Sequence, residues 1–137
     1  MQNIRTTDLL IKSGIKYSKA RSRILDICII AKHPLTVAEV AAKVGTNAHL
    51  ATIYRTLETF ASANLLSRVD FQEGKFRYEY EHDHHHHAVC ESCGKVAEVQ
   101  DKKLESVMDN LKVDSGFSIT RHALELFGLC KNCQNKG

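Results

Sequence analysis

The chain has 137 residues, 43% of them hydrophobic, with no Trp and one Pro, which suits one domain of ordinary size or two small ones. No stretch approaches the ~20 consecutive apolar residues needed to cross a bilayer. Met1–Leu10 has neither the basic nor the apolar region of a secretory signal. These features exclude a membrane protein and predict a cytoplasmic location.

The net charge of +3 is unevenly distributed along the chain. Residues 1–80 carry 12 Lys and Arg against 7 Asp and Glu, whereas residues 81–137 carry 7 against 9. The first part is therefore the better candidate for contact with a polyanion, although a mildly basic surface is often only solvated. We expect two domains, 1–80 and 81–137.

Three helices are predicted in the first domain. Apolar residues at helical spacing, Cys28 among them, predict a helix over Lys19–Lys32 whose apolar side is buried. Thr36 and Glu39 form the pattern of a capping box that opens a second helix, and Gly45 ends it. The third helix is expected over about Ala48–Ala63. Its inward residues are Leu50, Ile53 or Tyr54, Leu57 and Ala61, and its outward residues are Thr52, Arg55, Thr56 and Thr59.

Two strands follow, over Leu65–Phe71 and Lys75–Tyr80, joined by a short turn that contains Gly74. Three helices followed by a hairpin is the order of a winged helix-turn-helix, in which the last helix enters the major groove of DNA. Three-helix units also occur as protein-binding modules, and the pattern alone leaves that alternative open. The hairpin residues suited to phosphate contacts are Arg68, Lys75 and Arg77.

The second domain is predicted to be a small α/β unit. Short strands are expected at Ala88–Val89 and Lys95–Val99, and Asp101 can cap a helix that follows them. Phe117–Leu129 is expected to be mostly extended. So small a unit leaves strand edges open, which predicts a homodimer. The apolar stripe of the helix consists of Leu104, Val107, Met108 and Leu111.

Four of the five cysteines form two C-x-x-C pairs, Cys90 with Cys93 and Cys130 with Cys133. This spacing is typical of four thiolates around one tetrahedral zinc ion. Such a closed shell has no open position for chemistry, so we expect a structural zinc site. Cysteines in this spacing also fit a reducing compartment better than a disulfide scaffold.

A run of four histidines, His84–His87, directly precedes the first cysteine pair. If the run is extended, His85 and His87 face one way and His84 and His86 face the other, so the run can serve two separate metal sites. The alternative is a solvated surface run. Glu79, Glu98, Glu105, His33 and His122 could complete the ligand shells, but spacing does not select among them.

The segment Leu50-Ala-Thr-Ile-Tyr-Arg-Thr-Leu57 resembles the recognition helix of the ferric uptake regulator family. The histidine run, Val89-Cys90-x-x-Cys93-Gly94-Lys95, Gly116-Phe117, His122, Leu126-Phe127-Gly128 and the last cysteine pair resemble its dimerisation domain. The resemblance extends from about Gly14 to Cys133. It implies an α+β protein, with an N-terminal winged helix-turn-helix followed by a small C-terminal α/β dimerisation domain that holds a four-cysteine zinc site.

The family consists of dimeric, metal-activated bacterial transcription regulators, mostly repressors that bind A/T-rich inverted repeats. The resemblance implies a structural zinc site at Cys90, Cys93, Cys130 and Cys133. It implies a regulatory site that joins the two domains through His33, Glu79, His85, His87 and Glu98, and an additional metal site at His84, His86, Glu105 and His122. The residues that the resemblance places on double-stranded DNA include Lys16, Tyr54 and Arg55. Together with outward residues of the helices and arginines of the hairpin, the predicted DNA contacts are Lys16, Arg21, Thr52, Tyr54, Arg55, Arg68 and Arg77.

Some positions depart from the family pattern. His86 stands where many relatives have Asp, which could alter metal preference. His49 replaces a small hydroxyl residue, and Ala20 and Asn64 replace a usual Pro and a usual Gly. None of these departures removes a predicted ligand.

Imidazole and carboxylate ligands without sulfur suit Fe²⁺, Mn²⁺ or Zn²⁺. Glu98 stands where an aspartate accompanies peroxide sensing in the family, and no cysteine is available to the regulatory shell, so an iron-sensing repressor is predicted. Peroxide sensing and zinc sensing are the alternatives within the family. A His-rich metal store or chaperone is the alternative from another class, but it would not need a recognition helix. The sequence has no H-E-x-x-H element, and we do not expect an enzyme.

Overall fold

The computed structural model describes residues 2–45, 48–111 and 116–135. The chain divides into two compact units, Met1–His82 and Asp83–Gly137. The division falls two residues beyond the boundary expected from charge and motifs. None of the helices in the described part of the chain has both the length and the apolar character that a membrane crossing requires.

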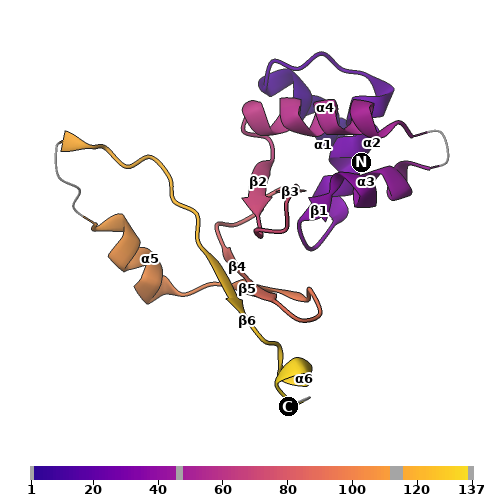
Figure 1. Ribbon diagram of the computed structural model, residues 1–137. Coiled ribbons are helices and arrows are strands. Elements are labelled where there is room, and N and C mark those ends of the chain that lie inside the picture. Colours follow the sequence, from indigo (N-terminus) through magenta and orange to yellow (C-terminus); the bar gives the residue numbers. More distant parts are fainter. Residues whose placement is uncertain (1, 46–47, 112–115, 136–137) are drawn as a thin grey trace. The chain divides into compact units, whose positions relative to one another are not determined.

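Among its described residues, the first unit contains four helices and a three-stranded sheet, and Figure 1 shows their arrangement. The helices are α1 (Gln2–Lys12), α2 (Lys19–Ile30), α3 (Val37–Val44) and α4 (Leu50–Ser62). The strands are β1 (Leu35–Thr36), β2 (Ser67–Asp70) and β3 (Phe76–Glu79), in the antiparallel order β1-β3-β2. A helical unit with a hairpin after its last long helix is the predicted winged helix-turn-helix order.

Local sequence explains the ends of these helices. Ser18 caps α2 by accepting a hydrogen bond from the Arg21 amide at 3.1 Å. The capping box of α3 is confirmed, because the Thr36 hydroxyl accepts from the Glu39 amide and the Glu39 carboxylate accepts from the Thr36 amide. Asn64 follows α4 with φ of 61°, a left-handed conformation that Asn tolerates and that explains why Gly is usual there.

The core of the first unit lies between its helices and the hairpin. Cys28 is buried in it, as predicted from its apolar surroundings. The fully or almost fully buried apolar side chains are Leu10, Ile24, Leu25, Cys28, Leu35, Val40, Ile53, Leu57, Phe60 and Tyr78.

Two expectations about this unit were wrong or incomplete. Helix α1 was not predicted, yet it packs on α2 and buries Thr6 and Leu10 completely. Leu50 was expected to face inward, but its side chain is 57% exposed, because it is the first residue of α4 and precedes the buried positions Ile53, Leu57 and Phe60.

In the part of the second unit that the structure describes, the strands pair in the order β5-β4-β6 and are accompanied by two helices. Its strands are β4 (His86–Cys90), β5 (Val96–Val99) and β6 (Glu125–Gly128), and its helices are α5 (Lys102–Asp109) and α6 (Lys131–Gln134). Strand β4 pairs antiparallel with β5 and parallel with β6. The Asp101 carboxylate caps α5 as predicted, accepting from the amides of Lys103 and Leu104. Figure 1 shows the long segment that leads into β6 running back to the sheet, where β6 pairs with β4.

Candidate metal centres

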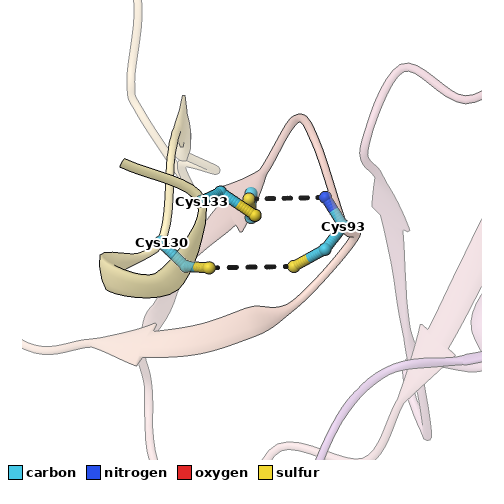
Figure 2. A group of neighbouring side chains, drawn as sticks. Cys93, Cys130 and Cys133 are labelled. Carbon is cyan, nitrogen blue, oxygen red and sulfur yellow. Dashed lines mark hydrogen bonds between the residues drawn. The ribbon is translucent and has the colours of Figure 1, made fainter. Parts of the chain in front are cut away.

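The four cysteines of the two C-x-x-C pairs come together at one end of the second sheet. Cys90 is the last residue of β4, and Cys130 and Cys133 belong to the start and body of α6. One sulfur from each of the four lies within 4.8 Å of the others. Figure 2 shows Cys130 and Cys133 facing Cys93, with the sulfurs of Cys93 and Cys130 3.7 Å apart. Zn–S bonds of about 2.3 Å at tetrahedral angles separate sulfurs by about 3.8 Å, so this cluster can hold a zinc ion.

The pKa is lowered at two of the thiols in this cluster and raised at a third. Backbone N–H groups of Cys130 and Cys93 point at the Cys90 sulfur and lower the pKa of its thiol to about 6. The pKa of Cys130 is also lowered, first by the backbone N–H of Cys133. At Cys133 a hydrogen bond from Ser92 lowers the pKa, but the neighbouring sulfurs outweigh it and raise the pKa to about 12. Thiolates this close repel one another, and a dication would offset that repulsion.

A second cluster joins the histidine run to α5 and to the segment before β6. Three imidazoles lie within hydrogen-bond distance of the Glu105 carboxylate. Its Oε1 is 2.8 Å from Nε2 of His84 and 3.0 Å from Nε2 of His122, and its Oε2 is 2.7 Å from Nε2 of His86. The Nε2 atoms of His84 and His122 are themselves 3.1 Å apart. All four predicted residues of the additional metal site are therefore brought together.

The donor set of this cluster fits a divalent cation. Metal–ligand bonds of about 2.0–2.1 Å separate neighbouring donors by roughly 3 Å, close to the distances observed. Desolvation raises the pKa of Glu105, but hydrogen bonds to His86 and His122 outweigh it and lower the pKa overall, which keeps the carboxylate ionised. Three imidazoles and one carboxylate suit zinc and the later divalent transition metals better than magnesium or calcium.

The other face of the histidine run carries part of the predicted regulatory site. The rings of His85 and His87 are 4.8 Å apart, and the rings of His84 and His86 are 4.8 Å apart on the opposite face, as alternation along an extended segment predicts. Nε2 of His85 lies 3.6 Å from Oε1 of Glu98 on β5. The three residues of this site that belong to the second unit are thus close to one another.

The remaining two predicted regulatory ligands belong to the first unit. His33 is exposed in the connection between α2 and β1, and Glu79 is the last residue of β3. Their part in the regulatory site remains a prediction.

The predicted DNA-contact residues fall into two groups in the first unit. Thr52, Tyr54 and Arg55 are exposed on α4, and Lys16 is exposed in the connection between α1 and α2. The hydroxyls of Thr56 and Thr59 donate to backbone carbonyls one turn earlier, so these two outward threonines support the helix itself.

The other group already has partners within the unit. Arg21 donates to the Lys16 carbonyl at 2.8 Å, which ties the connection before α2 to that helix. Arg68 forms a bidentate salt bridge with Glu58, and Arg77 forms one with Glu73. The distances from guanidinium nitrogen to carboxylate oxygen are 2.7 to 3.1 Å. Sequence reasoning missed both carboxylate partners, because Glu58 lies ten residues from Arg68 and no spacing rule connects a helix to a later strand.

The comparisons with known proteins agree with this geometry. The sequence model of the ferric uptake regulator family matches residues 12–127. The chain is 35% identical to the ferric uptake regulation protein of Neisseria meningitidis, over 100% of this chain and 99% of that protein. It is 28% identical to the peroxide-responsive repressor PerR of Staphylococcus saprophyticus, over 90% of this chain and 86% of that protein.

The fold is also shared with a solved regulator. The structure of the Helicobacter pylori ferric uptake regulator Fur, described as revealing three functional metal binding sites, superposes with a TM-score of 0.80. It is 25% identical and covers 97% of this chain and 91% of its own. With the family match spanning most of the sequence and the fold in agreement, this chain belongs to the ferric uptake regulator family of metal-responsive transcription regulators.

Proposed function

We propose that this protein is an iron-responsive repressor that binds A/T-rich inverted-repeat DNA as a homodimer in the cytoplasm when it is loaded with metal. The observation that carries the proposal is the combination, in one chain of this family, of an exposed helix α4 beside a hairpin with separate clusters of metal donors. A metal store would need the donors but not the helix. A catalytic role has no support from the closed cysteine shell.

We assign three metal sites, the number described for the Helicobacter pylori relative. Cys90, Cys93, Cys130 and Cys133 would hold structural zinc, since their sulfur spacing suits it. His84, His86, Glu105 and His122 would form the additional site. The regulatory site would consist of His33, Glu79, His85, His87 and Glu98.

In the regulatory site this chain would bring ligands from both units to one ion. The second unit would contribute the imidazoles of His85 and His87 and the carboxylate of Glu98, whose mutual placement supports this role. The first unit would contribute His33 and Glu79. When bound, a divalent cation supplies a charge and a coordination geometry that favour the arrangement in which all five ligands are within reach. Moving an equilibrium from mostly open to mostly closed takes up to ~5.5 kcal/mol of differential affinity.

For DNA we assign direct contacts to Thr52, Tyr54 and Arg55 on α4, which are exposed together, and to Lys16 at the connection before α2. A helix of this kind reads base edges in the major groove, and a dimer would place two of them on paired half-sites. The exposed strand edges and apolar side chains of the second unit support the dimer.

A metal titration of DNA binding tests the proposal. Anaerobic protein would be titrated with Fe²⁺, Mn²⁺ and Zn²⁺ while its binding to a duplex selected from a random pool is followed by fluorescence anisotropy. Metal-dependent binding is expected, with Arg55→Ala abolishing it and His33→Ala with Glu79→Ala removing its metal dependence. If the double variant responds to metal like the wild type, the two-unit regulatory site is wrong.

One alternative within the family has a specific observation behind it, the similarity to a peroxide-responsive repressor. Peroxide added to the iron-loaded protein, with mass spectrometry of the histidine-containing peptides, separates the two signals. Oxidised histidines and lost DNA binding at low peroxide would replace iron sensing with peroxide sensing.

A further inference from the structure

One carboxylate on the recognition helix holds both strands of the hairpin. Glu58, in the last part of α4, accepts hydrogen bonds from Arg68 of β2 at both oxygens: Nη2 lies 2.9 Å from Oε1, and Nε lies 2.9 Å from Oε2. The hydroxyl of Tyr78, on β3, also donates to Oε2 of Glu58. We call this group of three residues the Glu58 clamp.

The register of the hairpin explains why the clamp can form. Arg68 and Tyr78 are directly opposite each other in the β2–β3 pair, so both side chains leave the sheet on the same face. Tyr78 is 1% exposed and belongs to the core of the unit, which fixes its hydroxyl. The guanidinium of Arg68 also lies 5.9 Å from the centre of the Phe76 ring. Phe76 is on β3, two residues before Tyr78, and so on the same face of the sheet.

The charge states within the clamp reinforce its geometry. The hydrogen bond from Arg68 lowers the pKa of Glu58, and the same bond raises the pKa of Arg68. Burial raises the pKa of Tyr78, and the bond to Glu58 raises it further, so the hydroxyl keeps its proton to donate. The group therefore contains one full ion pair and one neutral donor at neutral pH.

We propose that Arg68 is a positioning residue, which sets the hairpin against the recognition helix through Glu58 and Tyr78, and that it does not contribute a phosphate contact. The inference rests on the proposed DNA-binding function. A planar guanidinium can grip both carboxylate oxygens at once, which an ammonium group cannot reproduce, so the clamp requires Arg at this position. Without it, the hairpin and α4 would be free to shift relative to each other, and DNA contacts made by both elements would lose their common alignment.

This assignment changes which hairpin cation attracts DNA. The Arg68 charge is offset by Glu58, and the Arg77 charge is offset in the same way by Glu73 at the turn. Lys75 is exposed and forms no hydrogen bond or salt bridge with the part of the chain that the structure describes. Phosphate attraction by the hairpin would therefore come from Lys75.

Salt dependence of DNA binding distinguishes a positioning residue from a phosphate contact. Losing one phosphate contact reduces the slope of log K against log salt by about one unit, whereas losing alignment lowers affinity and leaves the slope unchanged. The probe is a duplex selected from a random pool by the metal-loaded wild-type protein. Its binding to the full-length, metal-loaded variants is measured by anisotropy over a range of KCl concentrations.

Arg68→Gln is expected to weaken binding about threefold to fivefold, the range of a partly exposed ion pair, with an unchanged slope. Arg68→Lys is expected to behave like Arg68→Gln although it keeps the charge. Glu58→Gln combined with Arg68→Gln should weaken binding no more than either change alone. Lys75→Gln, the matched control, should lose about one unit of slope.

A reduced slope in Arg68→Gln together with wild-type binding by Arg68→Lys would overturn the inference, because charge alone would then account for the effect. If Arg68→Gln proves unfolded by circular dichroism, Tyr78→Phe supplies the test, since it removes one hydroxyl and no charge: weaker binding at constant slope supports the clamp, and wild-type binding overturns it. If the wild-type protein binds no duplex at all, the proposed function itself fails, and that outcome is distinct from a failure of the clamp alone.

Discussion

The two units of this chain are stabilised in different ways. The first unit buries a continuous set of apolar side chains, with Leu25, Leu57 and Phe60 completely inaccessible. In the described part of the second unit, one apolar residue is buried, Cys90. The other buried side chains there are His85, His86 and His87. A unit of this size without an apolar core commonly depends on a metal or on a second chain.

The second unit does have apolar side chains, but they are exposed. Val107 is 60% exposed on α5, and Leu126, Phe127 and Leu129 are exposed on and after β6. A pairing of two chains through these residues would bury them. In the residues that the structure describes, the first unit therefore has an apolar core of its own, whereas the second buries too little apolar surface in the single chain, which supports the proposed metal sites and homodimer.

The largest expected effect comes from the cysteine cluster. Cys93→Ser, or removal of zinc by a chelator, should unfold the second unit and leave the first folded, because structural zinc contributes about 10–16 kcal/mol in small domains. Amide resonances in a two-dimensional NMR spectrum would report each unit separately. Cys28→Ala is the matched control, since it changes the core of the first unit and should leave the zinc content unchanged. A second unit that stays folded without zinc would contradict the comparison.

Loss of apolar volume should affect the two units unequally. Leu57→Ala, at a fully buried position of α4, is expected to lower the free energy of unfolding of the first unit by about 2–5 kcal/mol. Val107→Ala in the second unit should cost less than about 0.5 kcal/mol in the dissociated chain. Urea unfolding at several protein concentrations measures both. An effect of Val107→Ala that grows with concentration would show that a second copy covers α5.

The cluster of His84, His86 and His122 around Glu105 should stabilise the second unit only in the presence of metal. Glu105→Gln retains the shape of the side chain and removes the charge that faces His84, His86 and His122. A roughly 10- to 100-fold loss of metal affinity would remove about 1.4–2.7 kcal/mol of metal-dependent stabilisation under saturating conditions. Calorimetric melting with and without added Zn²⁺ tests this. Equal melting temperatures of variant and wild type at all zinc concentrations would remove the metal role of this cluster.

The smallest expected effect concerns acid and the Glu58 clamp. Because the pKa of Glu58 is lowered from its ordinary value of 4.5, its contribution to stability is present above that value and is lost as pH falls through the lowered pKa. Arg68 and Glu58 are both partly exposed, so this contribution should be below about 1 kcal/mol. Urea unfolding of the first unit between about pH 6 and pH 3 should show a smaller decline in Arg68→Gln than in the wild type. An identical decline would mean that the ion pair adds nothing measurable.

The parts of this fold that local sequence determines were predictable. The capping box at Thr36, the cap at Asp101 and the alternation of the histidine run depend on neighbours a few residues away, and all three are confirmed. The exposure of Leu50 was not predictable, since helical spacing places it on the buried side and does not show that the core ends before the first residue of α4. Helix α1 was missed because its apolar signal is short and becomes clear only when it packs on α2.

The candidate sites divide in the same way. The C-x-x-C pairs identified the four-cysteine cluster without a structure, because the ligand spacing is itself the signal. Grouping His84 and His86 with Glu105 and His122 depended on family resemblance, since spacing alone did not select those partners. The partners of Arg68 and Arg77 were not predicted. Glu58 lies on α4, which the hairpin meets only after it folds, whereas Glu73 lies four residues before Arg77 at the turn of the same hairpin.

The parallel pairing of β4 with β6 affects the order in which the protein can fold during its synthesis. His87 lies opposite Glu125, so the central strand of the second sheet must wait for a segment almost forty residues later to leave the ribosome. The first unit has a pairing of similar separation, Leu35 with Tyr78, but all of its strands precede residue 83 and leave the ribosome before β6 is made. The nascent chain therefore presents every element of the winged helix while its histidine-rich strand still lacks one of its two neighbours.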